Sequence, residues 1–149
     1  MKRVLSRAVL GVAVLALLLV GAQARAAENA VSALDTYLSA LPNDFNTVST
    51  AAVQAKIDAG EPIYVLDVRE PAEFTAGHLP SAKNVPIREL VKRAAELPAD
   101  KSTPIVVYCK SGHRGAFGTE ALGLMGYKNV KNMAAAFGAW EKEGKPVSK

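Results

Sequence analysis

The feature that most constrains the fold is the run Pro104–Tyr108, which carries no charged side chain and reads as a strand that is apolar on both faces. A strand of this kind must be covered on both sides, which is typical of the middle of a parallel sheet. Parallel neighbours are joined by long crossover connections, and these are usually helices. The run therefore predicts an α/β domain.

Strand-like and helix-like patterns alternate along the chain from residue 45 onward. Short apolar runs predict strands at 46–48, 62–67, 82–85, 104–108 and 129–133. Apolar spacing, caps and breakers predict helices at 49–60, 71–74, 87–97, 114–124 and 135–143, the first of them with Ser49 as its N-cap. Within 87–97, helical spacing places four apolar residues on one face: Leu90, Val91, Ala94 and Leu97. With right-handed crossovers, these elements form a five-stranded parallel sheet flanked by helices on both faces.

Residues 1–26 have the parts of a secretory signal peptide. After a cationic start, 15 apolar or glycine residues run from Ala8 to Ala22, and Ala24-Arg25-Ala26 fits a cleavage site. This run is shorter than the roughly 20 residues of a spanning helix, which favours cleavage over an uncleaved membrane anchor. We therefore expect a periplasmic protein with no stable membrane insertion after cleavage.

The rest of the chain is long enough for one domain with its own core. We expect an N-terminal helical extension at 27–44, with a helix over 28–40, followed by a domain at 45–146. The signal segment holds four of the 18 basic residues and none of the 14 acidic residues, so the remainder is formally neutral. A neutral domain without a basic run lacks the electrostatic footprint of nucleic-acid binding, and we expect no nucleic-acid partner.

The only cysteine, Cys109, directly follows the central strand. In parallel α/β sheets, chemistry is found where a strand's carboxyl end meets the next helix. The turn Lys110–Arg114 carries two cations and a glycine, and it leads into a predicted helix. Backbone N–H groups, the helix dipole and the two cations all favour a thiolate, which is the nucleophilic form of cysteine. The turn is too polar for an inert core cysteine, and a reactive cysteine is therefore expected.

Segments in the right order and spacing give the chain a resemblance to the rhodanese family. These segments are Leu66–Glu70, Glu73-Phe74, Gly77–Ala82, Asn84–Pro86, Ile105–Arg114, Gly126-Tyr127, Asn129-Val130 and Gly138–Trp140. The resemblance implies the rhodanese-like fold, a five-stranded parallel sheet flanked by helices. Two positions depart from the pattern: Ala135-Ala136 stands where relatives commonly have Gly-Gly, and Gly115 where many have Ser or Thr.

The resemblance also implies a sulfurtransferase of the thiosulfate:cyanide type. In that mechanism Cys109 takes the outer sulfur of thiosulfate or a similar anionic donor as a persulfide, and a thiophilic acceptor, either a small molecule or a protein, then removes it. The implied substrate-binding residues are Lys110, Ser111, Gly112, His113 and Arg114. Lys110 and Arg114 would hold the donor's anionic end, whereas His113 either tunes the thiolate or faces water. Asp67 and Arg69 lie at the end of the neighbouring strand, and we expect Arg69 to pair with Glu73 or Asp67 and to brace the loop. No metal or organic cofactor is implied.

Two other functions remain open at this stage. Related folds use Cys-x5-Arg loops for phosphatase or arsenate reductase chemistry, whereas Arg114 follows Cys109 in a Cys-x4-Arg spacing and the next residue is Gly115. Glycine has no side chain to hold an oxyanion, so the loop length favours sulfur over phosphorus. A carrier role, in which Cys109 stores sulfur for a partner without turnover, fits the same cysteine equally well.

Overall fold

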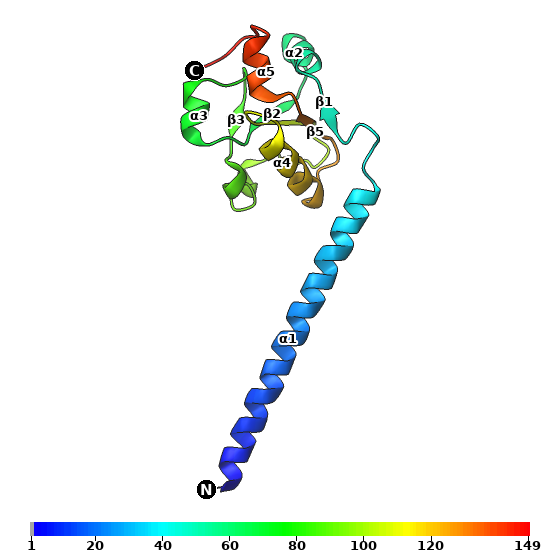
Figure 1. Ribbon diagram of the computed structural model, residues 1–149, viewed down its shortest axis with the longest axis vertical. Helices are drawn as coiled ribbons and strands as arrows, with labels where there is room; N and C mark the ends of the chain where they lie inside the picture. The colour runs from blue at the N-terminus through cyan, green and yellow to red at the C-terminus, as the bar shows by residue number, and fades with distance from the viewer. Residues whose placement is uncertain (1) are drawn as a thin grey trace. The chain divides into compact units, whose positions relative to one another are not determined.

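The computed structural model describes residues 2–149, with side chains from residue 20 onward, and the chain divides into two units at Ala40 (Figure 1). The first unit contains one helix, α1 (Lys2–Ser39), which includes residues 28–39 of the helix predicted over 28–40 but begins at Lys2. The cationic start of the predicted signal peptide lies outside the described side chains. Among the residues that are described, no helix combines the length and the hydropathy needed to cross a membrane.

The second unit, Leu41–Lys149, is built on a five-stranded sheet in the order β1-β5-β4-β2-β3. Every strand pair is parallel, which confirms the predicted sheet. The strands are β1 (Thr47–Val48), β2 (Tyr64–Asp67), β3 (Lys83–Asn84), β4 (Ile105–Tyr108) and β5 (Val130–Met133). The central strand β4 is buried at all four positions, as its apolar sequence requires.

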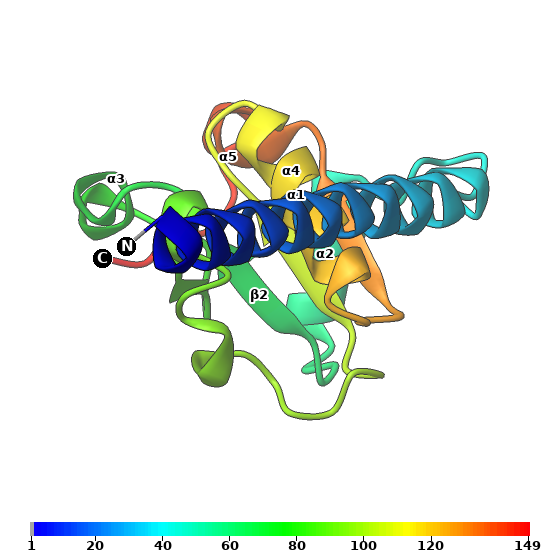
Figure 2. The same ribbon diagram turned by 90° about the horizontal axis from the view of Figure 1, so that it is seen from below.

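Helices cover both faces of this sheet (Figure 1, Figure 2). They are α2 (Thr50–Asp58), α3 (Pro71–Ala76), α4 (His113–Leu124) and α5 (Ala136–Lys142). One buried cluster joins the sheet to α4 and includes Val107 and Leu122, and the other joins it to α2 and α5 and includes Val106 and Trp140. Successive residues of β4 therefore point into opposite cores, which is the alternation expected of a strand between two layers.

The predicted helix at 87–97 is wrong. This segment forms two short 3₁₀ turns, η1 (Ile87–Glu89) and η2 (Ala94–Glu96). Leu90 and Leu97 are buried, but Val91 is 69% exposed, so the apolar residues do not share one covered face. The two tight turns, which follow β3 and precede β4 in the chain, bury both leucines in the core cluster that contains Val107 and Leu122. This packing overrides the local periodicity.

Candidate active site

Cys109 lies at the carboxyl end of β4, and its side chain is only 1% exposed. The Gly112 N–H donates a hydrogen bond to its Sγ over 3.2 Å, which closes the loop around the sulfur. Gly112 has a φ of 91°, and a Cβ there would lie 2.3 Å from the carbonyl oxygen of Ala134. Only glycine fits this turn, because both the backbone conformation and the close approach exclude a side chain.

The start of α5 holds the other side of the loop. The N–H groups of Phe137 and Gly138 donate to the carbonyl oxygens of Cys109 and Lys110, at 2.9 and 3.0 Å. Ala136, in the position where relatives commonly have glycine, is fully buried with a φ of 59°. Alanine therefore adopts a left-handed conformation here, which is strained for a residue with a Cβ.

The second departure from the family pattern also has a structural reason. A Cβ at Gly115 would lie 2.4 Å from Oδ1 of Asn132 on β5. The same Asn132 side chain is buried and donates from Nδ2 to the carbonyl oxygen of Gly112 at 3.4 Å. A glycine in the first turn of α4 thus leaves room for an asparagine that contacts the loop.

Arg114 forms a two-pronged ion pair with Glu73 of α3. Its Nη1 and Nη2 donate to the two carboxylate oxygens at 2.6 and 2.9 Å. This hydrogen bonding lowers the pKa of Glu73 to about 2. It also raises the pKa of Arg114. Arg114 lies in the first turn of α4, directly after the loop around Cys109, and Glu73 binds both of its Nη atoms.

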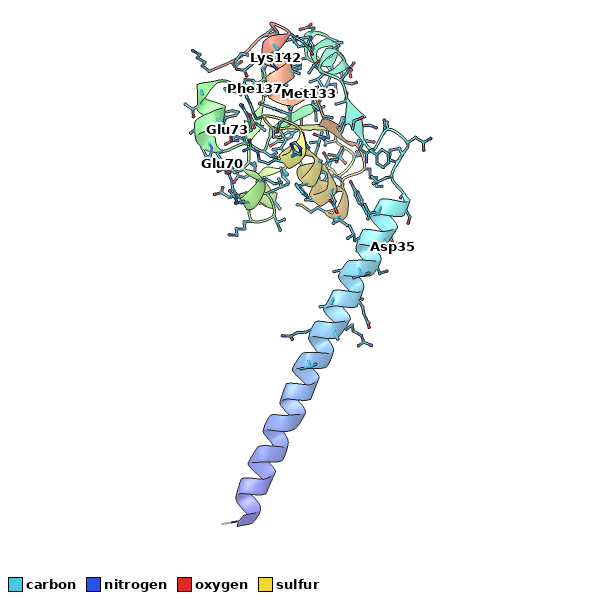
Figure 3. All side chains as sticks on the ribbon, in the orientation of Figure 1. Asp35, Glu70, Glu73, Met133, Phe137 and Lys142 are labelled. Carbon is cyan, nitrogen blue, oxygen red and sulfur yellow. The ribbon has the colours of Figure 1, made fainter. Side chains whose placement is uncertain are left out.

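Glu73 is also fixed by its own helix. Its Oε2 accepts a hydrogen bond from the Glu70 N–H at 3.1 Å, in the third-residue position of a capping box. Glu70, the N-cap, and Glu73 both lie at the start of α3 (Figure 3). The sequence did not indicate the pairing between Glu73 and Arg114, because the two residues are 41 positions apart.

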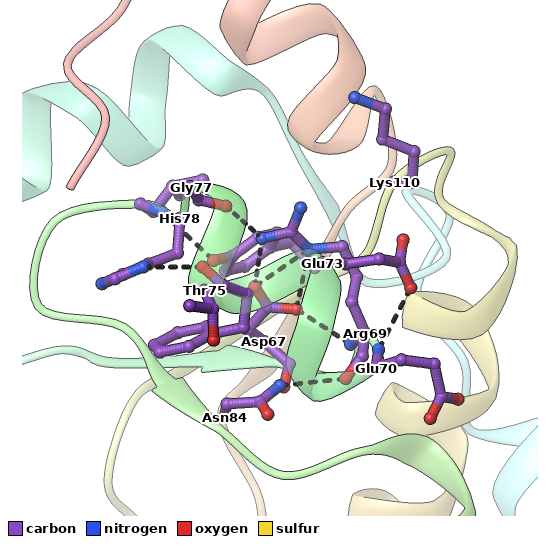
Figure 4. Close-up of polar contacts among 12 residues, drawn as sticks. Asp67, Arg69, Glu70, Glu73, Thr75, Gly77, His78, Asn84 and Lys110 are labelled. Carbon is purple, nitrogen blue, oxygen red and sulfur yellow. Dashed lines mark hydrogen bonds and ion pairs between the residues drawn. The ribbon is translucent and has the colours of Figure 1, made fainter. Parts of the chain in front are cut away.

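The other loop cation turns toward α5. Nζ of Lys110 is 2.5 Å from Oε2 of Glu141, and the side chain is about half exposed. Figure 4 shows this side chain extending toward α5 rather than toward Glu73. Ser111 and His113 are exposed, and their Oγ and Nδ1 atoms are 3.1 Å apart. Both predicted cations of the loop are therefore paired with carboxylates.

Asp67 and Arg69 form a buried pair beneath α3 (Figure 4). Arg69 is 2% exposed, and its Nη2 lies 2.6 Å from Asp67 Oδ2 and 2.7 Å from the Gly77 carbonyl oxygen. Its guanidinium stacks 4.1 Å from the centre of the Phe137 ring. Because Asp67 is the register partner of Tyr108, this pair lies beside the end of β4 and links β2, α3 and α5.

A pocket of about 240 Å³ opens between α3, the loop and α5. It is lined by Arg69, Glu73, Ala76, Gly77, Lys110, Phe137 and Glu141. The site as a whole combines a cysteine, enclosed by a short loop whose Gly112 N–H contacts the sulfur, with two partly exposed ion pairs around that loop. Cys109 is buried and does not itself line this pocket. A sulfur nucleophile that a fixed backbone donor contacts suits covalent transfer of a small group.

The sequence pattern of the Rhodanese-like domain family matches residues 49–143. The chain belongs to this family.

Three similar proteins illustrate the relationship. A sulfurtransferase of Allochromatium vinosum is 29% identical over 102 residues, covering 68% of this chain and 94% of the relative. The thiosulfate sulfurtransferase PspE of Escherichia coli is 36% identical over 67 residues, covering 45% and 64%. The crystal structure of a rhodanese-related protein from Thermoplasma volcanium aligns with a TM-score of 0.62 at 30% identity, covering 69% of this chain and 97% of the other. Family membership and these relatives support sulfurtransferase activity.

Proposed function

We propose that the protein moves sulfane sulfur from thiosulfate or a similar anionic donor to a thiophilic acceptor through a persulfide on Cys109. The Cys109 thiolate attacks the outer sulfur of thiosulfate and forms a new S–S bond. The S–S bond of the donor breaks, and its electron pair leaves with sulfite. A second nucleophile, such as cyanide or a thiolate, then attacks the outer persulfide sulfur and restores the thiolate.

The observation that carries this proposal is the position of the sulfur. Sγ of Cys109 accepts the Gly112 N–H at the base of a short loop that runs directly into α4. Fixed backbone donors and the start of a helix stabilise negative charge in such a loop without reorganising during the reaction. The same donors can stabilise the negative charge of the thiolate before the transfer and that of the persulfide after it.

The test is to mix the protein with thiosulfate and measure its intact mass. We expect a gain of one sulfur, about 32 Da, which Cys109→Ser abolishes and cyanide removes. High turnover in a thiosulfate:cyanide assay would identify an enzyme, whereas loading without turnover would identify a carrier. Efficient hydrolysis of an aryl phosphate without persulfide formation would instead favour the phosphatase alternative.

We further propose that residues 1–26 are a cleaved signal peptide and that the domain acts in the periplasm. The cationic start, the 15-residue apolar run and the Ala24-Arg25-Ala26 site support this proposal. N-terminal sequencing of the protein expressed in a bacterial host should find a start near Ala27 in the periplasmic fraction. Recovery of the intact N-terminus in the membrane fraction would overturn the proposal.

A further inference from the structure

Each cation close to Cys109 has a carboxylate partner. Arg114 is paired with Glu73, Lys110 with Glu141, and Arg69 with Asp67. The Asp67–Arg69 pair is buried, whereas the other two pairs lie at the rim of the site, where a donor would enter.

The pair between Arg114 and Glu73 lies next to the loop that encloses the sulfur. Arg114 stands in the first turn of α4, two residues after the Gly112 N–H that contacts Sγ of Cys109, and Glu73 binds both of its Nη atoms. The two side chains are each about one-third exposed, so a small anion in water can reach the pair. An anion that binds Arg114 through the same two Nη atoms must displace Glu73 or lie against its carboxylate. In either case the nearby Glu73 carboxylate repels the anion, and this repulsion grows with the negative charge of the anion.

We propose that Glu73 is a specificity-determining residue, which competes with the donor for Arg114 and so weakens binding of dianionic donors relative to monoanionic ones. This inference rests on the proposed sulfur transfer through Cys109. Glu73 is well placed for such a role because the Glu70 N–H donates to its Oε2 and so fixes the orientation of the carboxylate. Its carboxylate remains ionised at any pH at which the reaction would be run, since its pKa is about 2.

Two donors that react by the same step isolate the effect of charge. Thiosulfate is a dianion that releases sulfite, and methanethiosulfonate is a monoanion that releases methanesulfinate. In both cases the Cys109 thiolate attacks the terminal sulfur, one S–S bond forms, and the S–S bond of the donor breaks. The readout is the ratio of the KM values for the two donors, measured with cyanide as the acceptor. A change in access or in loop geometry alters both KM values, whereas competition by charge alters their ratio.

Glu73→Gln is the test variant, because glutamine keeps the size of the side chain and an oxygen that can accept the Glu70 N–H. We expect the KM for thiosulfate to fall roughly three- to tenfold, the range for losing one partly exposed ionic competitor, and the KM for methanethiosulfonate to fall less. Glu70→Gln is the matched control. It removes the same charge from the same helix, but Glu70 contacts the exposed Arg88 at 3.6 Å and not Arg114.

A double-mutant cycle with Arg114→Gln completes the test, because competition for Arg114 cannot operate in its absence. In that background, Glu73→Gln should leave the KM ratio unchanged. A rise in the KM for thiosulfate in Glu73→Gln, an equal change for both donors, or an equal shift in ratio in Glu70→Gln would each overturn the proposal. If wild-type protein forms a Cys109 persulfide but the ratio does not respond to Glu73→Gln, only this inference fails. If no persulfide forms from either donor, the proposed function fails with it.

Discussion

Gly112→Ala is the substitution whose consequence the structure defines most sharply. Gly112 has a φ of 91°, and the new Cβ would lie 2.3 Å from the carbonyl oxygen of Ala134. Gly126 provides a matched control, because its φ is 90° and nothing lies within 4 Å of the corresponding Cβ position. Alanine at Gly126 therefore incurs only the cost of a left-handed conformation, which is about 1–2 kcal/mol. Alanine at Gly112 incurs the same cost together with a collision against backbone.

The two costs can be added to give an expected difference in stability. Forcing an extra carbon into a filled space costs about 1–3 kcal/mol, so Gly112→Ala should lose about 2–5 kcal/mol of unfolding free energy against about 1–2 for Gly126→Ala. Urea unfolding of both variants measures the difference directly. In a domain of this size each kcal/mol corresponds to a fall in Tm of roughly 4–8 °C, which makes the two variants easy to separate.

The same pair of variants separates stability from chemistry. The N–H of Gly112 donates to the Cys109 sulfur at 3.2 Å, so any shift of the loop that relieves the collision also disturbs this contact. We expect Gly112→Ala to form the persulfide more slowly than wild type under conditions in which both are folded, and Gly126→Ala to form it at the wild-type rate. Equal losses of stability, with wild-type rates in both variants, would refute the reasoning.

Three further predictions concern the groups around the loop. Ala136→Gly should raise the unfolding free energy by up to about 1 kcal/mol in urea titrations, because it relieves a φ of 59°. Asp67→Asn should cost about 3–5 kcal/mol in the same assay, since it leaves the buried Arg69 unpaired. Arg114 lowers the pKa of Glu73 from its ordinary value of 4.5 to about 2, so the stability from this pair is complete above pH 4.5 and is lost as the pH falls through about 2. Glu73→Gln should reduce the acid sensitivity of the urea midpoint in that window.

The elements that the sequence predicted correctly are those with local signals. Ser49 is the expected N-cap, with its side chain accepting the Ala52 N–H, and the apolar run at 104–108 is the buried central strand. The Asp67–Arg69 pair was also one of two pairings expected for Arg69, because the two residues are close in sequence at the end of one strand. Signals of this kind operate within a few residues and do not depend on the rest of the fold.

The failures arise where distant parts of the chain decide the outcome. The spacing in 87–97 satisfies a helical pattern, yet the exposure of Val91 shows that the sheet covers only part of it. The partners of the loop cations, Glu73 and Glu141, are 41 and 31 residues away from them. The number of carboxylates in the sequence cannot show which of them will face the loop. Only the fold, which brings α3 and α5 to the end of β4, determines these pairs.

The pairing of the cations changes the account of how negative charge is stabilised at Cys109. The sequence suggested that Lys110 and Arg114 provide a positive field, but Glu141 and Glu73 largely cancel their charges at a distance. The donors that remain available are backbone groups, of which the Gly112 N–H already contacts the sulfur. Backbone dipoles are held by the loop and cannot be displaced by a substrate, whereas each side-chain pair can exchange its partner. If Cys109 transfers sulfur as proposed, its negative charge therefore depends on fixed backbone donors, whereas the charge of the incoming sulfur donor acts on the exchangeable side-chain pairs.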